Sequence, residues 1–174
     1  SFFQSVTLRT AGFVSFDQAG MYDGTKALCA VLMLVGGSSG STAGGIKTVT
    51  VLVLLLFLLA RARGKSSVTV FKRTIPFSQA LDAMTIATIV AGLAVVGAIV
   101  ISLTSPVSFI HALYESASAI ATVGITAGAT GSLSILAQIM IIIFMYFGRV
   151  GILTISLGFL MGDRAQERFH YAET

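Results

Sequence analysis

The stretch VGGSSGSTAGGIKT, from Val35 to Thr48, interrupts an apolar run that extends from Lys26 to Ala60. Five of its ten central residues, 36–45, are glycines. Each glycine in a helix interior costs roughly 1 kcal/mol relative to alanine, so together they disfavour a continuous helix. The sequence therefore predicts two helical halves joined by non-helical backbone, with the second half resuming at Thr48.

The chain as a whole is strongly apolar. Of its 174 residues 55% are hydrophobic and 10% are charged, and its mean hydropathy is +0.93. Soluble domains carry roughly 25% charged residues, so this composition indicates a membrane protein. Because the sequence does not begin with methionine, we expect it to be a fragment of a longer polypeptide.

Three further segments complete the expected architecture. Leu81 to Leu103 supplies the ~20 residues that a transmembrane helix needs. Leu133 to Met161 forms a second long span, in which Arg149 is the one charged residue. Between them, Val107 to Thr122 is too short to cross the membrane and return as helix, so we expect a half-membrane helix. The prediction is an all-α membrane protein.

The Lys and Arg residues are unevenly distributed. Five lie between Arg61 and Arg73 with no acidic residue among them, whereas 105–135 contains none. Under the positive-inside rule, the basic loop 62–78 and the tail 163–174 are expected on the cytoplasmic side, and 105–135 outside. We expect no binding of nucleic acid to the basic loop, because long apolar segments flank it on both sides.

Few residues suggest other chemistry. Cys29 is the single cysteine, His111 and His170 are isolated, and no Ser-His-Asp or paired-carboxylate arrangement occurs. We therefore expect no side-chain metal centre, no bound cofactor and no enzymatic activity. The glycine-rich stretch also departs from a phosphate-binding loop, since Ile46 separates its last glycine from the lysine.

Part of the chain overlays on itself without a gap when Thr10 is placed on Thr122. The same shift places Gly12 on Gly124 and Gly36 on Gly148. Each copy has the same order of features: a short helix, Thr-x-Gly, a polar turn, a long apolar helix and a glycine-marked break. The sequence thus predicts tandem repeats, of which the first lacks its leading helix.

The two Thr-x-Gly segments, Thr10–Phe13 and Thr122–Ile125, each follow a short helix and precede a long one. A dehydrated cation needs a ring of oxygens in place of its water, and converging backbone carbonyls can supply it. Glycine permits the backbone angles that direct successive carbonyls inward. The two segments are therefore candidates for binding a monovalent cation.

Three stretches, Arg9–Phe13, Val35–Thr48 and Gly148–Gly151, resemble the Trk/Ktr/HKT superfamily, most closely its bacterial Trk and Ktr potassium uptake subunits. The resemblance covers essentially the whole chain. It implies a single-chain, pseudo-fourfold pore of helix–pore-loop–helix repeats, in which 1–61 is part of the third repeat and 79–162 is the fourth. It further implies a plasma-membrane homodimer with a cytosolic nucleotide-binding regulatory ring. Potassium is the transported ion that it implies, and sodium is a further candidate.

The resemblance assigns two groups of residues to the ion path. The filter would comprise Thr10, Ala11, Gly12, Phe13, Thr122, Val123, Gly124 and Ile125. The gate would comprise Gly36, Gly37, Ser38, Ser39, Gly40, Ser41, Thr42, Ala43, Gly44 and Gly45. We add Lys47 and Arg149 to the gate because they are charges within apolar segments. A charge inside an apolar span is costly, so Arg149 is expected either to repel a permeating cation or to hold helices together through carbonyl groups.

Alternatives stay open for single residues and for the function. Lys47 is either a second gating cation or a lysine whose ammonium group reaches the membrane surface. Glu115 is expected either to support the filter by hydrogen bonds or to attract cations. The glycine-rich break alone also suits a secondary transporter whose broken helices bind substrate near the bilayer midplane. A structural subunit without its own path is a third interpretation, and the paired Thr-x-Gly segments favour the pore.

Overall fold

The fold is built largely from helices, and the computed structural model describes residues 2–38, 43–64, 68–70 and 73–162. In chain order the elements are α1 (Phe2–Thr7), α2 (Asp23–Leu34), α3 (Thr48–Ala62), β1 (Val68–Val70), β2 (Arg73–Ile75), α4 (Phe77–Thr104), α5 (Phe109–Ile120), the 3-10 turn η1 (Thr130–Ser132) and α6 (Ile135–Gly162). The predicted helical character is confirmed.

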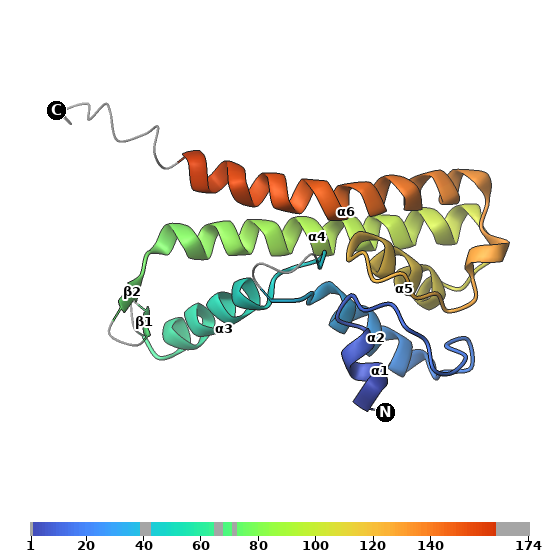
Figure 1. Ribbon diagram of the computed structural model, residues 1–174, viewed down its shortest axis with the longest axis horizontal. Helices are drawn as coiled ribbons and strands as arrows, with labels where there is room; N and C mark the ends of the chain where they lie inside the picture. Colours follow the sequence, from blue (N-terminus) through green and yellow to red (C-terminus); the bar gives the residue numbers. More distant parts are fainter. Residues whose placement is uncertain (1, 39–42, 65–67, 71–72, 163–174) are drawn as a thin grey trace.

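The two longest helices, α4 and α6, lie side by side and run in opposite directions (Figure 1). The short helix α5 lies near the end of α4 and the start of α6, and it contacts both of them. On its other side α5 contacts α2. The helix α3 lies along the first part of α4, to which the basic loop joins it (Figure 1). Helix α5 therefore joins α2, from the first part of the chain, to α4 and α6.

Helix α4 can cross a membrane by its length and composition, and it is the one helix of the described residues that meets both criteria. Its 28 residues extend over about 42 Å, compared with about 30 Å for the hydrocarbon core of a bilayer. The predicted span Leu81–Leu103 lies within it. Two shorter apolar helical stretches, Thr48–Ala62 and Ile135–Val150, accompany it.

The predicted helix break is confirmed, since α2 ends at Leu34 and α3 begins at Thr48. The backbone pairs across this break: the Gly36 N–H donates to the Ile46 carbonyl oxygen, and the Ile46 N–H to that of Leu34, both at 2.8 Å. Gly45 has a φ of +70°, a conformation that L-residues rarely adopt. The glycine-rich stretch therefore leaves the first half-helix and returns close to it. Ser39, Gly40, Ser41 and Thr42 lie outside the described residues.

The basic loop contains a small antiparallel hairpin that the sequence interpretation missed. Strands β1 and β2 pair with Val68 opposite Ile75 and Val70 opposite Arg73. The β-branched residues that make up most of Val-Thr-Val and Arg-Thr-Ile favour this pairing. Besides an isolated bridge between Val35 and Ile46, the hairpin is the one departure from an all-helical fold among the described residues.

Small side chains let α5 pack closely against its neighbours. Every residue from Tyr114 to Ile120 is buried, and four of these seven are serine or alanine. The Ser116 hydroxyl donates a 2.8 Å hydrogen bond to the Ala94 carbonyl oxygen of α4. A Cβ built on Gly97 would collide with the Ser116 hydroxyl and the Phe144 ring of α6. Small residues and interhelical hydrogen bonds of this kind are typical of helix packing in membranes.

Candidate functional site

The two Thr-x-Gly segments share one unusual backbone conformation. Thr10 and Gly12 have φ values of 65° and 78°, and Thr122 and Gly124 have values of 54° and 85°. The residue between each pair has a negative φ. Thr10 and Thr122 are the two non-glycine residues with positive φ in the described part of the chain. A β-branched residue rarely adopts this conformation, which costs about 1–3 kcal/mol where it persists.

A hydroxyl group of the preceding helix holds each segment. The Thr7 hydroxyl accepts the Phe13 N–H at 2.8 Å and donates to the Phe13 carbonyl oxygen at 2.7 Å. The Ser118 hydroxyl accepts the Ile125 N–H at 3.0 Å. Both hydroxyl-bearing side chains are buried. The backbone after each glycine is therefore fixed to the helix that precedes it.

The main-chain hydrogen bonds repeat in the same way. The Ala11 N–H donates to the Thr7 carbonyl oxygen at 3.1 Å, and the Val123 N–H to that of Ser118 at 2.9 Å. The predicted shift that aligns the two segments does not align these two hydroxyl-bearing residues, which are offset by a single position. The second helix has one more residue between its hydroxyl and its Thr-x-Gly segment, and the hydrogen bonds adapt to it.

The structure brings the two segments against each other. A Cβ built on Gly12 would lie 2.6 Å from the Val123 carbonyl oxygen, so only a glycine permits this approach. Around Val123, alternate residues of the second segment are buried, among them Ala121 and Ile125. The first segment is more open, since Phe13 is 68% exposed whereas Ile125 is 2% exposed.

Glu115 lies behind the second segment and is buried. Its Oε1 accepts the Ala127 N–H at 3.1 Å and a short hydrogen bond from the Thr126 hydroxyl. Its Oε2 accepts the Thr130 hydroxyl at 3.2 Å. The carboxylate therefore orders the backbone that follows Gly124. Charge-assisted hydrogen bonds of this kind are among the stronger ones in proteins.

Two glycines that mark the predicted breaks, Gly44 and Gly148, lie against the second segment. The break predicted at Gly148 is wrong, because α6 continues as one helix from Ile135 to Gly162. A Cβ on Gly44 would lie 2.7 Å from the Ala121 carbonyl oxygen and would collide with the Thr122 hydroxyl. A Cβ on Gly148 would collide with the Ile120 carbonyl oxygen and lie 3.2 Å from Thr122 Cγ2. The helix turn that carries Gly148 and the end of the glycine-rich stretch thus meet at the same residue, Thr122.

The predicted gate residues fall into three places. Gly36, Gly37, Ser38, Ala43, Gly44 and Gly45 are described and flank the four residues outside the described part. Lys47 folds back on the stretch, where its ammonium group donates a 2.7 Å hydrogen bond to the Ala43 carbonyl oxygen. Arg149 follows Gly148 on α6 and is exposed within this chain.

Two polar groups near the segments were not anticipated. Gln4 Nε2 donates to Gln18 Oε1 at 2.9 Å, and the Tyr114 hydroxyl lies 3.3 Å from the same oxygen. This buried group links α1 to α5. The expectation that His111 is isolated is wrong, because its Nε2 lies 2.7 Å from the Nζ atom of the buried Lys26.

The sequence did contain a signal for the first of these groups. Gln4 precedes Thr7 by the same spacing as Glu115 precedes Ser118. The two polar side chains therefore hold equivalent positions on the helices that lead into the two segments. An overlay based on the hydroxyl-bearing residues would have paired them.

Comparison with known proteins gives consistent matches. The family model described as the cation transport protein TrkH matches residues 1–168. The potassium/sodium uptake protein NtpJ of Enterococcus hirae is 39% identical over 99% of this chain and 40% of its own length. The Ktr system potassium uptake proteins B and D of Bacillus subtilis are 35% and 36% identical, over 97% and 98% of this chain and 38% of each relative. The chain therefore spans about two fifths of the length of these relatives.

The hydroxyl contacts of the first segment can be tested with Thr7→Val in the whole protein. The change removes the partner of a backbone N–H and a carbonyl, and we expect a loss of about 1–3 kcal/mol of local stability. Hydrogen–deuterium exchange of peptides covering 8–16 should be faster. Thr7→Ser keeps the hydroxyl and should preserve slow exchange. Equal exchange in Thr7→Val and the unmodified protein would show that this hydroxyl does not hold the segment.

Proposed function

Because this chain belongs to the TrkH family of cation transport proteins, we propose that it forms part of a pathway for potassium ions across the membrane. It is a membrane protein, and its relatives carry names of potassium uptake proteins. The chain contributes two of four repeats, and the rest of the longer protein contributes the others. The high exposure of Phe13 supports this proposal, because a further repeat would cover it.

The proposed selectivity filter is lined by carbonyl groups of Thr10–Phe13 and Thr122–Ile125. The observation that carries the proposal is the matched pair of positive φ values in each segment, at threonine and at glycine. Alternation between positive and negative φ can turn successive carbonyls to one side, whereas an ordinary extended strand alternates them. Strain of about 1–3 kcal/mol at each threonine is a cost that a purely structural turn would not require.

The proposed gate is the glycine-rich stretch 36–45 with Lys47 and Arg149. Two observations support it: Gly44 approaches Thr122, and the Lys47 ammonium group binds the Ala43 carbonyl oxygen. The turn of α6 before Arg149 approaches the same threonine. A guanidinium group at this depth raises the energy of a potassium ion by direct repulsion. Movement of the stretch away from Thr122 then opens the pathway.

The proposed orientation follows from the charges. The basic loop 62–78 and the tail 163–174 face the cytoplasm, and both filter segments face outward.

The proposed domains are the partial third repeat, 1–61, and the fourth repeat, 79–162. The proposed partners are a second copy of the whole protein and a cytosolic nucleotide-binding ring, with sodium as a further ion. A secondary transporter with a midplane site is the alternative, which the broken helix between α2 and α3 favours.

Substitution Gly124→Ser tests the filter. A Cβ at Gly124 meets nothing within 4 Å, so any effect arises from its φ of +85° rather than from a collision. The left-handed conformation costs an L-residue about 1–2 kcal/mol, and we expect the preference for potassium over sodium to fall by about tenfold. The measurement is rubidium uptake by the whole protein in competition with potassium and sodium.

The matched control is Gly131→Ser, where a Cβ also meets nothing within 4 Å and φ is not positive. It should leave the preference unchanged. An unaltered preference in Gly124→Ser, with normal amounts of folded protein, would contradict the filter assignment. It would favour the secondary transporter or the structural subunit.

Substitution Arg149→Ala tests the gate. Removing the positive charge from the pathway should raise potassium flux, whereas Arg149→Lys keeps the charge and should stay near the original rate. Patch-clamp recording or rubidium uptake measures the effect in the whole protein. The gate assignment fails if Arg149→Ala folds normally and its flux is equal or lower.

A further inference from the structure

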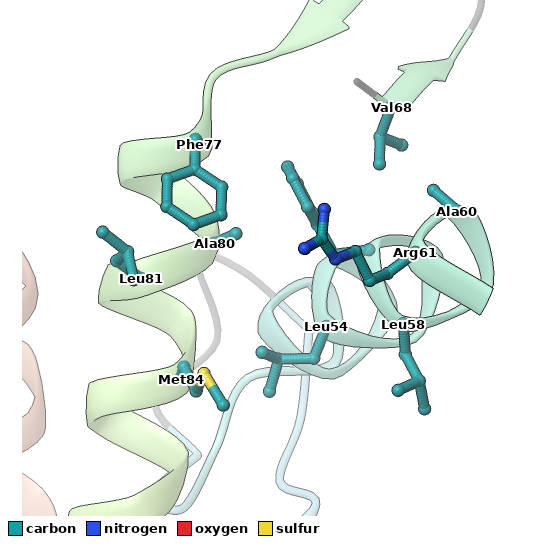
Figure 2. Close-up of a pocket in the computed structure, with 10 residues that line it drawn as sticks. Leu54, Leu58, Ala60, Arg61, Val68, Phe77, Ala80, Leu81 and Met84 are labelled. Carbon is teal, nitrogen blue, oxygen red and sulfur yellow. The ribbon is translucent and has the colours of Figure 1, made fainter. Parts of the chain in front are cut away.

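A cavity of about 560 Å³ lies between α3, α4 and the hairpin of the basic loop (Figure 2). The ends of α3 and α4 that join this hairpin lie far from α1 and α5, which lead into the Thr-x-Gly segments (Figure 1). Its volume falls within the roughly 300–1,000 Å³ that is usual for small-molecule sites. The residues that line it are Leu54, Phe57, Leu58, Ala60, Arg61, Val68, Phe77, Ala80, Leu81 and Met84. Nine of these ten are apolar, and one, Arg61, is charged.

The walls of the cavity are apolar and open outward. Phe57 of α3 and Phe77 of α4 meet edge to face, with ring centroids 6.3 Å apart. Leu58 and Met84 are 68% and 61% exposed, so the cavity communicates with the surroundings of the helices. In a membrane protein such surroundings include lipid chains. An apolar opening of this kind suits a hydrocarbon chain.

Arg61 supplies the charge at this site. Figure 2 shows its guanidinium group directed from α3 across the cavity toward α4. No carboxylate pairs with Arg61 within the described residues, where the ion pair of Lys26 and Asp23 is the one found. The sequence contains no acidic residue from Lys47 to Leu81. A guanidinium group carries five N–H donors in a planar fork, which matches the oxygens of a phosphate.

We propose that this cavity binds an anionic phospholipid, with the phosphate on Arg61 and the start of an acyl chain against the apolar walls. A free phosphate would leave these walls exposed, and a lipid without a phosphate would leave the guanidinium without an anion. The choline of a zwitterionic lipid would add a further positive charge beside the basic loop, so an anionic headgroup suits the site better. The position beside the basic loop also agrees with the charge of the cytoplasmic leaflet, which attracts basic segments next to a membrane helix. The site is independent of the proposed ion pathway, which lies at the other end of α3.

The test measures lipid retained by the whole protein in detergent, with native mass spectrometry as the readout. The probes are dioleoyl phosphatidylglycerol and the zwitterionic dioleoyl phosphatidylcholine. The unmodified protein should retain the anionic lipid preferentially. Arg61→Gln should weaken its retention about fivefold, as expected for one basic group at an anionic headgroup. Arg63→Gln is the matched control, because Arg63 is exposed as Arg61 is but does not line the cavity.

A second pair of variants tests the apolar walls. Leu58→Trp fills the cavity and keeps Arg61, so it should also reduce retention of phosphatidylglycerol. Leu55→Trp changes an exposed leucine of the same helix that does not line the cavity, and it should have no effect. Thermal unfolding of each variant shows that it is folded. Lipid retention is measured without any measurement of transport. The lipid-site proposal can therefore be contradicted while the ion-pathway proposal holds, and the ion-pathway proposal can be contradicted while the lipid site holds.

Three results would overturn the proposal. Unchanged retention in both Arg61→Gln and Leu58→Trp would mean that another part of the whole protein covers the cavity. Equal losses in the two control variants would indicate diffuse attraction of lipid to the basic loop. Displacement of the lipid by millimolar inorganic phosphate would indicate an anion site that does not use the apolar walls.

Discussion

In each Thr-x-Gly segment the threonine and the glycine are held at positive φ, and much of the surrounding structure maintains this conformation. Threonine does not adopt this conformation without support, because its branched side chain crowds the backbone. For each segment a buried hydroxyl, from Thr7 or Ser118, binds the residue after the glycine. Gly12 packs on the Val123 carbonyl oxygen, and Gly44 and Gly148 close in on Thr122. Backbone strain of this kind persists only where the surrounding structure fixes the conformation.

Helix α5 connects the two segments to the rest of the chain, because it packs against α2, α4 and α6. Its serine and alanine residues allow α4 and α6 to approach, and Ser116 hydrogen-bonds to α4. Its Glu115 carboxylate orders the backbone after the second segment. On the opposite side, Tyr114 reaches Gln18 and thereby joins α5 to the N-terminal part of the chain. A short helix buried on three sides thus positions both Thr-x-Gly segments.

The sequence was a good guide where local composition decides the structure. The glycines from 36 to 45 mark the gap between Leu34 and Thr48, and the uncharged run near Leu81–Leu103 lies within α4. Overlaying the chain on itself aligned the two Thr-x-Gly segments, whose φ values then proved alike. The contact of Lys26 with His111 joins residues 85 apart and depends on how α2 meets α5. No local pattern encodes that approach, and the hairpin of the basic loop was missed because its strands have only three residues each.

The central claim is that the carbonyl oxygens of the two segments bind a dehydrated monovalent cation together. The most direct measurement is anomalous X-ray scattering from crystals of the whole protein in which thallium replaces potassium. The account predicts anomalous peaks on the axis between the two segments, in contact with carbonyl oxygens of Thr10–Gly12 and of Thr122–Gly124. Peaks confined to the glycine-rich stretch, with none between the segments, would contradict it.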